Sequence, residues 1–288
     1  GATESINLAL KGAAHFYKDK GKHLVTVRTE HKATLDTVRE LEREGFTATY
    51  LDVLPDGLLD LAAFEKALQP DTIVVSVMAV NNEVGTITDL AAVRQVVRRH
   101  APTALLHTDA VQAASWLDLR TITPHVDFLS LSAHKFGGPK GVGLLVAREG
   151  AQFAPILIGG GQEGERRSGT HNVGGIVAMA EALRITDANR ADDVARISRL
   201  RDRLVDGLVA SVSGVRETVS REHKVAGAAH LCIDGIENEA LLFLLDEAGV
   251  CASAAAACAA GAMEPSHVLA AMGVPRSLAL GAVRFSLG

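Results

Sequence analysis

The feature that most constrains the fold is the alternation of short apolar runs with amphipathic stretches over the first 150 residues. The clearest apolar run is TIVVSVMAV at residues 72–80. A nearly continuous run of this kind is typical of a strand that is buried on both faces, as in helix-covered parallel sheets. Further strands are predicted at 23–27, 47–53, 104–108, 128–132 and 143–147, and helices at 5–17, 33–44, 61–68 and 90–100. We therefore expect an α/β fold with a mainly parallel sheet flanked by helices.

The pattern changes after the three glycines at 159–161, where a polar segment leads into a long helical stretch. We predict this helix from residue 173 to about 212, with a break near 187–192. Shorter elements follow, with strands predicted at 231–234 and 283–287 and helices at 239–246 and 265–272. These elements indicate a large domain at 1–190 and a smaller α+β C-terminal domain at 191–288.

The charge and the cysteine content of the chain argue against several classes of function. The formal net charge of −5 gives no reason to expect a nucleic acid or an anionic membrane as partner. Apolar runs fall short of the length needed to cross a bilayer. Three cysteines without a CxxC or HExxH motif argue against a disulfide framework or a structural zinc site. We expect a reduced, cytoplasmic setting, no metal of the chain's own, and Cys232 and Cys251 as inert core residues.

Polar residues cluster where the predicted strands end, at 29–31, 81–83, 109 and 132–135. Ligands of open α/β sheets collect at the carboxyl ends of the strands. Lys135 follows a predicted buried strand and precedes a glycine-rich turn, which makes it a candidate for Schiff-base chemistry. From this stretch alone, Lys135 could equally be a solvated residue at a loop tip.

These polar groups together suit one cofactor. The start of the first helix, at residues 1–3, can bind a phosphate, and Ser132 and His134 can add donors. Asp109 can face a heterocycle nitrogen, and His31 can lie flat against a ring. With Lys135 as a buried imine-forming amine, the set fits pyridoxal phosphate. Singly, His31 could be a surface histidine and Asp109 a helix cap.

Eight sequence motifs, spread over nearly the whole chain, resemble those of one known family. They are GATES, TEHKATLDT, NNEVGTITDL, HTDAVQ, SAHKFGGPKGVG, GGGQEGERRSGT, CASAAAACAAGAMEPSHVL and VRFSLG. They closely resemble cysteine desulfurases of the NifS/IscS-like group, and look closest to the nitrogen-fixation type. The resemblance implies a pyridoxal-phosphate fold type I homodimer. It also implies conversion of L-cysteine to L-alanine, with the sulfur passed as a persulfide to an iron–sulfur scaffold protein.

The resemblance also implies roles for residues around the cofactor ring. Lys135 matches the lysine that binds pyridoxal phosphate covalently and then removes the substrate α-proton. Asp109 matches the carboxylate at the pyridinium nitrogen. His31 matches the histidine stacked on the ring, a candidate acid–base group. Gln112 matches the side chain at the ring phenolic oxygen, and Asn82 the asparagine near that oxygen and the substrate carboxylate.

Further roles concern the phosphate, the substrate and the sulfur. Cys258 matches the nucleophile that takes the sulfur, and its persulfide could contact a partner's iron–sulfur cluster. Arg284 matches the arginine that binds the substrate α-carboxylate, although alone it could be a strand-edge charge. Thr170 matches a threonine that reaches the phosphate of the neighbouring subunit. The residues matching the phosphate cradle are Ala2, Thr3, Ser132 and His134. Without the resemblance, a core cysteine would be the favoured interpretation of Cys258.

The sequence departs from the family pattern before the cysteine, where four alanines replace Ser-Gly-Ser-Ala. Alanines favour helix and stiffen a loop, so we expect a slower persulfide step. Family chains also begin earlier and continue further, so we expect a fragment that lacks both ends. Two alternatives remain open. One is a selenocysteine lyase or related small aminotransferase-fold enzyme, and the other is an inactive truncated form that only dimerises or binds partners.

Overall fold

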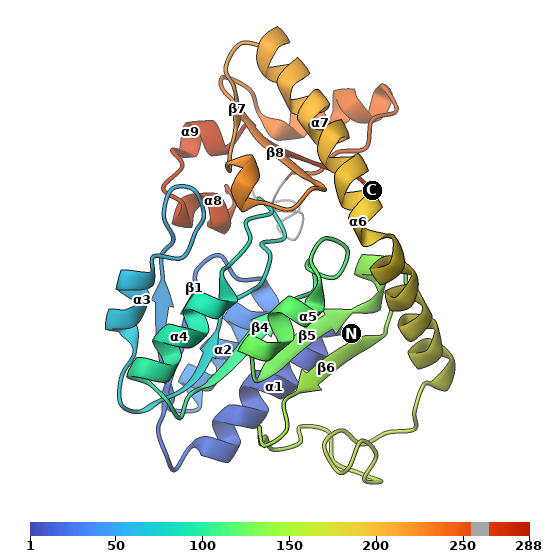
Figure 1. The fold of residues 1–288 in the computed structure, drawn as a ribbon. Helices are drawn as coiled ribbons and strands as arrows, with labels where there is room; N and C mark the ends of the chain where they lie inside the picture. Colours follow the sequence, from blue (N-terminus) through green and yellow to red (C-terminus); the bar gives the residue numbers. More distant parts are fainter. Residues whose placement is uncertain (255–264) are drawn as a thin grey trace. The chain divides into compact units, whose positions relative to one another are not determined.

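The computed structural model describes residues 1–254 and 265–288 (Figure 1). Its chain forms two compact units. The first contains Gly1–Leu51, Asp60–Ala79 and Thr88–Asn189, and the second contains Asp52–Leu59, Val80–Ile87 and Arg190–Gly288. Two short stretches from the first half of the sequence therefore belong to the second unit.

The first unit is built on a six-stranded sheet in the order β2-β1-β3-β4-β5-β6. The first five strands in this order run parallel, and β6 is antiparallel to β5. The predicted mainly parallel sheet is thus confirmed. Its strands are β1 (His23–Val27), β2 (Thr47–Leu51), β3 (Thr72–Ser76), β4 (Leu105–Asp109), β5 (Phe128–Ser132) and β6 (Gly143–Ala147).

Several helices of the first unit begin at side chains that cap them. Asp60 accepts hydrogen bonds from the N–H groups of Ala62 and Ala63, and Asp89 accepts one from Ala92. Such caps satisfy donors that the first helical turn leaves open. The helices are α1 (Ala2–Tyr17), α2 (Lys32–Arg43), α3 (Leu61–Ala67), α4 (Leu90–His100) and α5 (Leu119–Ile122), with 3₁₀ turns η1 (Thr123–His125) and η2 (Ala133–Phe136).

The core of the first unit lies where α1 packs on the sheet. Ile6 and Leu10 of α1 share one buried cluster with Leu24, Val74 and Phe128 from three strands. The apolar positions of α1 recur at helical spacing, so one helix face covers apolar strand residues. This packing fixes the N-terminus of α1 relative to β5 and β6.

His107 ties the centre of the sheet together. Its Nδ1 lies 2.8 Å from Oγ of Ser76 in β3, and its Nε2 lies 3.0 Å from Oγ of Ser130 in β5. Burial lowers the pKa of His107 to about 3, because a charged imidazolium has no water around it there. His107 is therefore a neutral, structural residue.

The second unit contains a three-stranded antiparallel sheet, β7-β8-β9. Two apolar clusters pack against it, one around Val268 and Leu269 and one around Val205 and Leu231. The long helix α6 (Val173–Ser211) runs from the first unit into the second. The other elements are β7 (Val215–Glu217), η3 (Arg221–His223), β8 (Ala228–Ile233), α7 (Asn238–Glu247), α8 (His267–Ala271), α9 (Arg276–Ala279) and β9 (Ala282–Ser286).

Two sequence predictions about these elements are wrong. The strand predicted at 72–80 ends at Ser76. Beyond it, the N–H groups of Val77 and Ala79 still donate to carbonyl oxygens of β4, but the N–H of Met78 donates to the side chain of Glu30. The predicted break at 187–192 is absent from α6, which is continuous over 39 residues. That stretch holds no glycine or proline, and Asn189 donates from its side chain to the carbonyl oxygen of Ile185 within the helix. Among the described residues, we find no helix long and apolar enough to cross a membrane.

Candidate functional site

Lys135 lies in η2, directly after the fully buried strand β5. In a 3₁₀ turn, residues three apart share a face, and Ala133 and Phe136 accordingly face the interior. His134 and Lys135 between them are exposed. The prediction of a buried lysine is therefore wrong for the side chain, although its strand is buried. Gly137 ends the turn at φ 79°, a conformation that favours glycine.

Asp109 is the last residue of β4, the neighbour of β5 in the sheet. Its side chain is 4% exposed, and Oδ1 accepts a hydrogen bond of 2.9 Å from the N–H of Val111. Burial raises the pKa of Asp109 to about 6, against the opposing effects of the Val111 bond and the positive charge of Lys135. The amine and the carboxylate thus lie close enough at the carboxyl edge of the sheet to interact electrostatically.

Glu30 adds a second buried carboxyl group at this edge. It is fully buried, and Oε1 accepts a hydrogen bond of 2.5 Å from the N–H of Met78. Burial raises the pKa of Glu30 well above its ordinary value, and the charge of Asp109 raises it further. Two nearby buried carboxyls resist ionising together. Glu30 lies in the polar cluster at 29–31, but no sequence pattern predicts a role for it.

The residues predicted to hold a phosphate come together at the start of α1. Ser132 pairs with Gly143 across β5 and β6. A Cβ atom at Gly143 would lie 2.5 Å from the carbonyl carbon of Gly1, so the backbone at the start of α1 approaches β6 closely. Oγ of Ser132 lies 2.9 Å from Nδ1 of His134. Ala2 and Thr3 follow Gly1 as the first helical residues, whose N–H groups have no partner within the helix.

The surroundings of His134 are electropositive. Although His134 is exposed, partial desolvation lowers its pKa, and the positive charges of Lys135 and Lys140 lower it further. A helix N-terminus beside two lysines and a hydroxyl group is a favourable place for an anion.

His31 caps α2 and lies half-buried. Its Nδ1 accepts a hydrogen bond of 3.1 Å from the N–H of Ala33, which leaves Nε2 to carry the proton of the neutral ring. His31 and Thr3 both line a pocket of about 350 Å³ between α1 and α2. The structure thus brings the predicted ring-stacking residue and one predicted phosphate residue to the same pocket.

Gln112 and Thr170 lie on irregular segments of the first unit. Gln112 is half-buried in the turn that follows β4, three residues after Asp109. Thr170 is exposed on the polar segment before α6. An exposed hydroxyl there is open to a second chain.

Asn82 and Arg284, the predicted substrate-binding residues, lie in the second unit and contact one another. Nη1 of Arg284 donates a hydrogen bond of 2.6 Å to the backbone carbonyl oxygen of Asn82. Asn81 shapes the turn, because its Oδ1 accepts from the N–H groups of Glu83 and Val84 at 2.9 and 3.0 Å.

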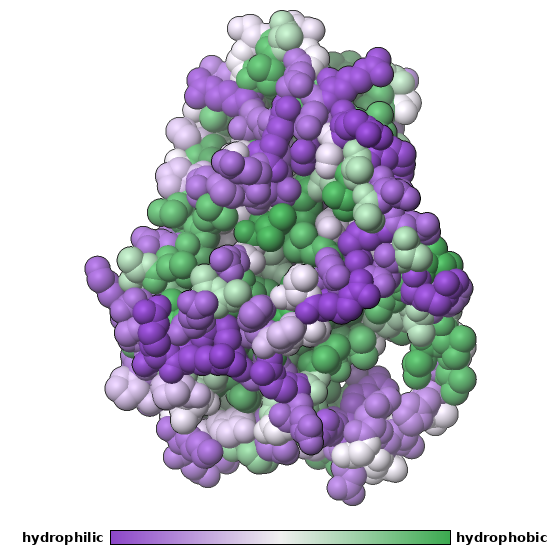
Figure 2. Space-filling model, viewed as in Figure 1, coloured by the Kyte–Doolittle hydropathy of each residue, from purple (hydrophilic) through white to green (hydrophobic). Residues whose placement is uncertain are grey.

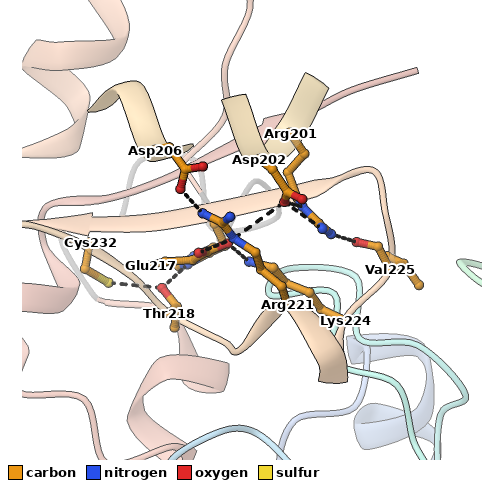
Figure 3. Close-up of polar contacts among 10 residues, drawn as sticks. Arg201, Asp202, Asp206, Glu217, Thr218, Arg221, Lys224, Val225 and Cys232 are labelled. Carbon is orange, nitrogen blue, oxygen red and sulfur yellow. Dashed lines mark hydrogen bonds and ion pairs between the residues drawn. The ribbon is translucent and has the colours of Figure 1, made fainter. Parts of the chain in front are cut away.

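The loop at 80–87 is supported by the segment after η3. The N–H of Ile87 donates to the carbonyl oxygen of His223 at 2.8 Å, and the N–H of Val225 donates to that of Gly85 at 3.0 Å. This segment is itself held by charged side chains (Figure 3). Lys224 pairs with Glu217 of β7, so the backbone on which the loop rests has a fixed position.

Arg201 and Arg221 also hold the segment after η3 in place. Nη1 of Arg201 in α6 donates to the carbonyl oxygen of Val225 at 3.1 Å. Arg221 pairs with Asp206 of α6 at 2.6 Å and with Glu217 at 3.0 Å (Figure 3). Because the side chain of Lys224 is buried, its pair with Glu217 is screened little by solvent, whereas the Arg221–Asp206 pair is more exposed.

The cysteines differ in their environments. Cys232 is buried in β8, 3.7 Å from Oγ1 of Thr218, as predicted for a core residue. Cys251 is exposed, so its prediction as a core residue is wrong. It follows Gly249, which has a φ of 75°, and precedes the bridge of Ser253 to β9, so it lies outside any strand. Cys258 lies outside the described residues.

A mainly parallel α/β sheet with an amine and a buried carboxylate at its carboxyl edge defines the class of protein. The chain belongs to the class-V aminotransferase family, whose model matches residues 1–288. Similar curated relatives are cysteine desulfurases named IscS. The protein from Tolumonas auensis is 48% identical over 290 residues, and that from Mannheimia succiniciproducens is 45% identical over 293. Each alignment covers 100% of this chain and 70% of the relative.

Solved structures agree with this assignment. A NifS-like protein superposes with a TM-score of 0.91 at 38% identity, over 99% of this chain and 75% of that one. SspA in complex with cysteine superposes with a TM-score of 0.84 at 30% identity, over 100% of this chain and 79% of that one. The family resemblance stated from the sequence is confirmed.

Proposed function

We propose that this chain is a pyridoxal-phosphate-dependent cysteine desulfurase that converts L-cysteine to L-alanine and transfers the sulfur to Cys258 as a persulfide. The observation that carries the proposal is the electrostatic interaction of Lys135 with the buried Asp109 at the carboxyl edge of β4 and β5. Relatives named cysteine desulfurase and the cysteine-bound SspA structure support the choice of substrate.

The donor set fits pyridoxal phosphate. Asp109 offers a buried carboxylate for a ring nitrogen, and its raised pKa means that a cationic partner would restore the charged form. Ser132, His134 and the N-terminus of α1 would hold the phosphate. Lys135 would supply the amine.

Further side chains would position the ring. His31 would stack on it, and Gln112 and Asn82 would contact its oxygen. Pyridoxal phosphate, when bound, would supply an electron sink for the α-carbon. Because the carboxylate of Asp109 is fixed by the N–H of Val111, it can hold a ring without reorganising.

Each reacting group of the chain has a proposed task. The amine of Lys135 removes the α-proton of L-cysteine. The thiolate of Cys258 attacks the substrate sulfur, so that an S–S bond forms while the C–S bond breaks, and the former sulfur-bearing carbon takes a proton. The products are L-alanine and a Cys258 persulfide, which an iron–sulfur scaffold protein would accept. Arg284 binds the α-carboxylate.

We also propose a homodimer. Apolar side chains lie exposed over the first half of α6, where green atoms gather at the right edge of the view in Figure 2. They include Val173, Ile176 and Val177, and nearby in sequence Ile158 is 89% exposed. Patches of this kind mark interfaces. Thr170, just before α6, would then reach the partner's phosphate.

The test is cofactor loading followed by product analysis. The purified chain is incubated with pyridoxal phosphate, reduced with borohydride and mapped by mass spectrometry. We expect the cofactor mass on the Lys135 peptide and its absence from a Lys135→Ala variant. L-Cysteine should then give L-alanine and persulfide, and Cys258→Ala should lose the persulfide while keeping the cofactor.

Three outcomes contradict the proposal. A keto-acid product would identify an aminotransferase, and turnover of L-selenocysteine without that of L-cysteine would identify a selenocysteine lyase. Failure of the wild-type chain to take up the cofactor would favour an inactive form that only dimerises or binds partners.

A further inference from the structure

Glu83 is a buried carboxylate that the proposed mechanism does not use. It lies in the 80–87 loop and is 4% exposed. Its N–H donates to Oδ1 of Asn81, so the turn itself fixes its backbone. Its Oε2 accepts a short hydrogen bond from the hydroxyl of Ser266. Burying such a group is costly unless its partners are fixed.

Ser266 is equally constrained. Its Oγ caps α8 by accepting from the N–H groups of Val268 and Leu269, at 3.0 and 3.4 Å. A hydroxyl group has one proton, and in Ser266 that proton goes to Glu83. Glu83 therefore acts as an acceptor, and its carboxylate joins the 80–87 loop to the start of α8.

Charge links Glu83 to Arg284. Burial raises the pKa of Glu83, whereas the Ser266 hydrogen bond and the electrostatic influence of His267 and Arg284 lower it. Arg284 in turn donates to the carbonyl oxygen of Asn82, the residue before Glu83. The guanidinium thus interacts with two consecutive residues of one loop, with the backbone of one and the charge of the other.

We propose that Glu83 is a positioning residue for the substrate carboxylate, because it orients Arg284 and ties the loop that carries both contacts to Ser266. The inference rests on the proposed function. A guanidinium whose orientation is fixed by protein partners can bind a carboxylate without first ordering its side chain. The ligand class is an α-amino acid with a free carboxylate.

The test separates charge from hydrogen bonding in the cofactor-loaded full chain. Glu83→Gln keeps an acceptor for Ser266 but removes the charge. We expect KM for L-cysteine to rise about tenfold while kcat changes less than about twofold, the pattern of a lost uniform binding contact. The dissociation constant of L-alanine should rise by the same factor. L-Alaninamide, which has no carboxylate, should bind Glu83→Gln and the wild-type chain equally.

Two further variants complete the experiment. Ser266→Ala keeps the charge of Glu83 and loses the hydrogen bond to it, so it should weaken L-alanine binding about threefold. If Glu83→Gln does not fold, Ser266→Ala provides the test instead. Glu222→Gln removes an exposed carboxylate of the same unit and should change nothing.

The inference is overturned if Glu83→Gln binds L-alanine as the wild-type chain does, or if L-alanine and L-alaninamide weaken equally, since that marks a purely structural role. If the wild-type chain forms no L-alanine from L-cysteine and binds neither ligand, the proposed function itself is wrong and the inference falls with it.

Discussion

Arg284 in the last strand donates a hydrogen bond of 2.6 Å to the backbone carbonyl oxygen of Asn82, which precedes it by 202 residues. Asn82 and Arg284 are both predicted to lie near the substrate carboxylate, and this contact brings them next to one another. Neither residue alone indicated a binding site, because a strand-edge arginine and a loop asparagine are common on protein surfaces.

Arg284→Lys tests this contact. Lysine keeps the positive charge but lacks the planar fork that can hold Asn82 and a carboxylate at once. We expect KM for L-cysteine to rise about tenfold to a hundredfold with a smaller change in kcat, measured by L-alanine formation. An unchanged KM would rule out Arg284 as the carboxylate-binding residue.

Asp109→Asn tests the burial of the carboxylate. The folded chain holds the Asp109 proton up to a pH of about 6, whereas the ordinary pKa is 3.8. The unfolded chain therefore binds fewer protons between these values, and folding stability falls as the pH rises through them. The loss is about 3 kcal/mol above pH 6.

In the cofactor-free chain, Asp109→Asn should therefore be more stable than the wild type at pH 7 and equal to it below about pH 4. Urea unfolding across this range measures the difference. A constant difference at all pH values would show that Asp109 does not titrate as its burial indicates.

Gly143→Ala tests the approach of α1 to β6. The new Cβ would lie 2.5 Å from the carbonyl carbon of Gly1, so the start of α1 must move. We expect a loss of about 1–3 kcal/mol in stability and weaker binding of pyridoxal phosphate, measured by urea unfolding and cofactor titration. Gly174→Ala is the matched control, since that glycine has no atom within 4 Å of an added Cβ.

Lys224→Met tests the charged group in Figure 3. The Lys224 side chain is 0% exposed and pairs with Glu217. Removing the lysine leaves Glu217 paired with Arg221, so we expect a loss of about 1–3 kcal/mol in urea unfolding, which is less than for an isolated buried charge. Adding Glu217→Gln should recover part of the loss, and simple additivity of the two variants would show that they do not interact.

Cysteine labelling tests the burial of the thiols. Iodoacetamide should modify Cys251 in the folded chain and Cys232 only after denaturation, because the first is exposed and the second buried. Peptide mass mapping distinguishes the sites. Equal labelling rates under native conditions would contradict the packing of β8.

Local patterns were sufficient for most elements of the first unit. The strands at 23–27, 128–132 and 143–147 and the helix at 90–100 end where the sequence predicts, because apolar runs and flanking polar residues mark them. The short elements α5, β7 and α9 went unpredicted, since three or four residues carry too little periodicity.

Long-range contacts explain what sequence could not predict. The segments 52–59 and 80–87 belong to the second unit, because their partners lie more than a hundred residues away, as with Gly85 and Val225. Cys251 was expected in the core, but a turn at Gly249 and a bridge at Ser253 leave it outside the sheet and exposed. The exposure of Lys135 could not be predicted either, because it depends on which face of η2 packs against the interior.

The imidazole of His107, fixed between two serine hydroxyls, makes the central sheet sensitive to acid. An unfolded histidine takes up a proton near pH 6.5, whereas the folded one resists until about pH 3. Stability therefore declines as the pH falls between these values, by about 5 kcal/mol for this residue. Acidification thus lowers the stability contributed by His107, whereas it removes the cost of the buried charge on Asp109, two residues further along the same strand. The two residues of β4 therefore change the folding stability in opposite directions as the pH falls.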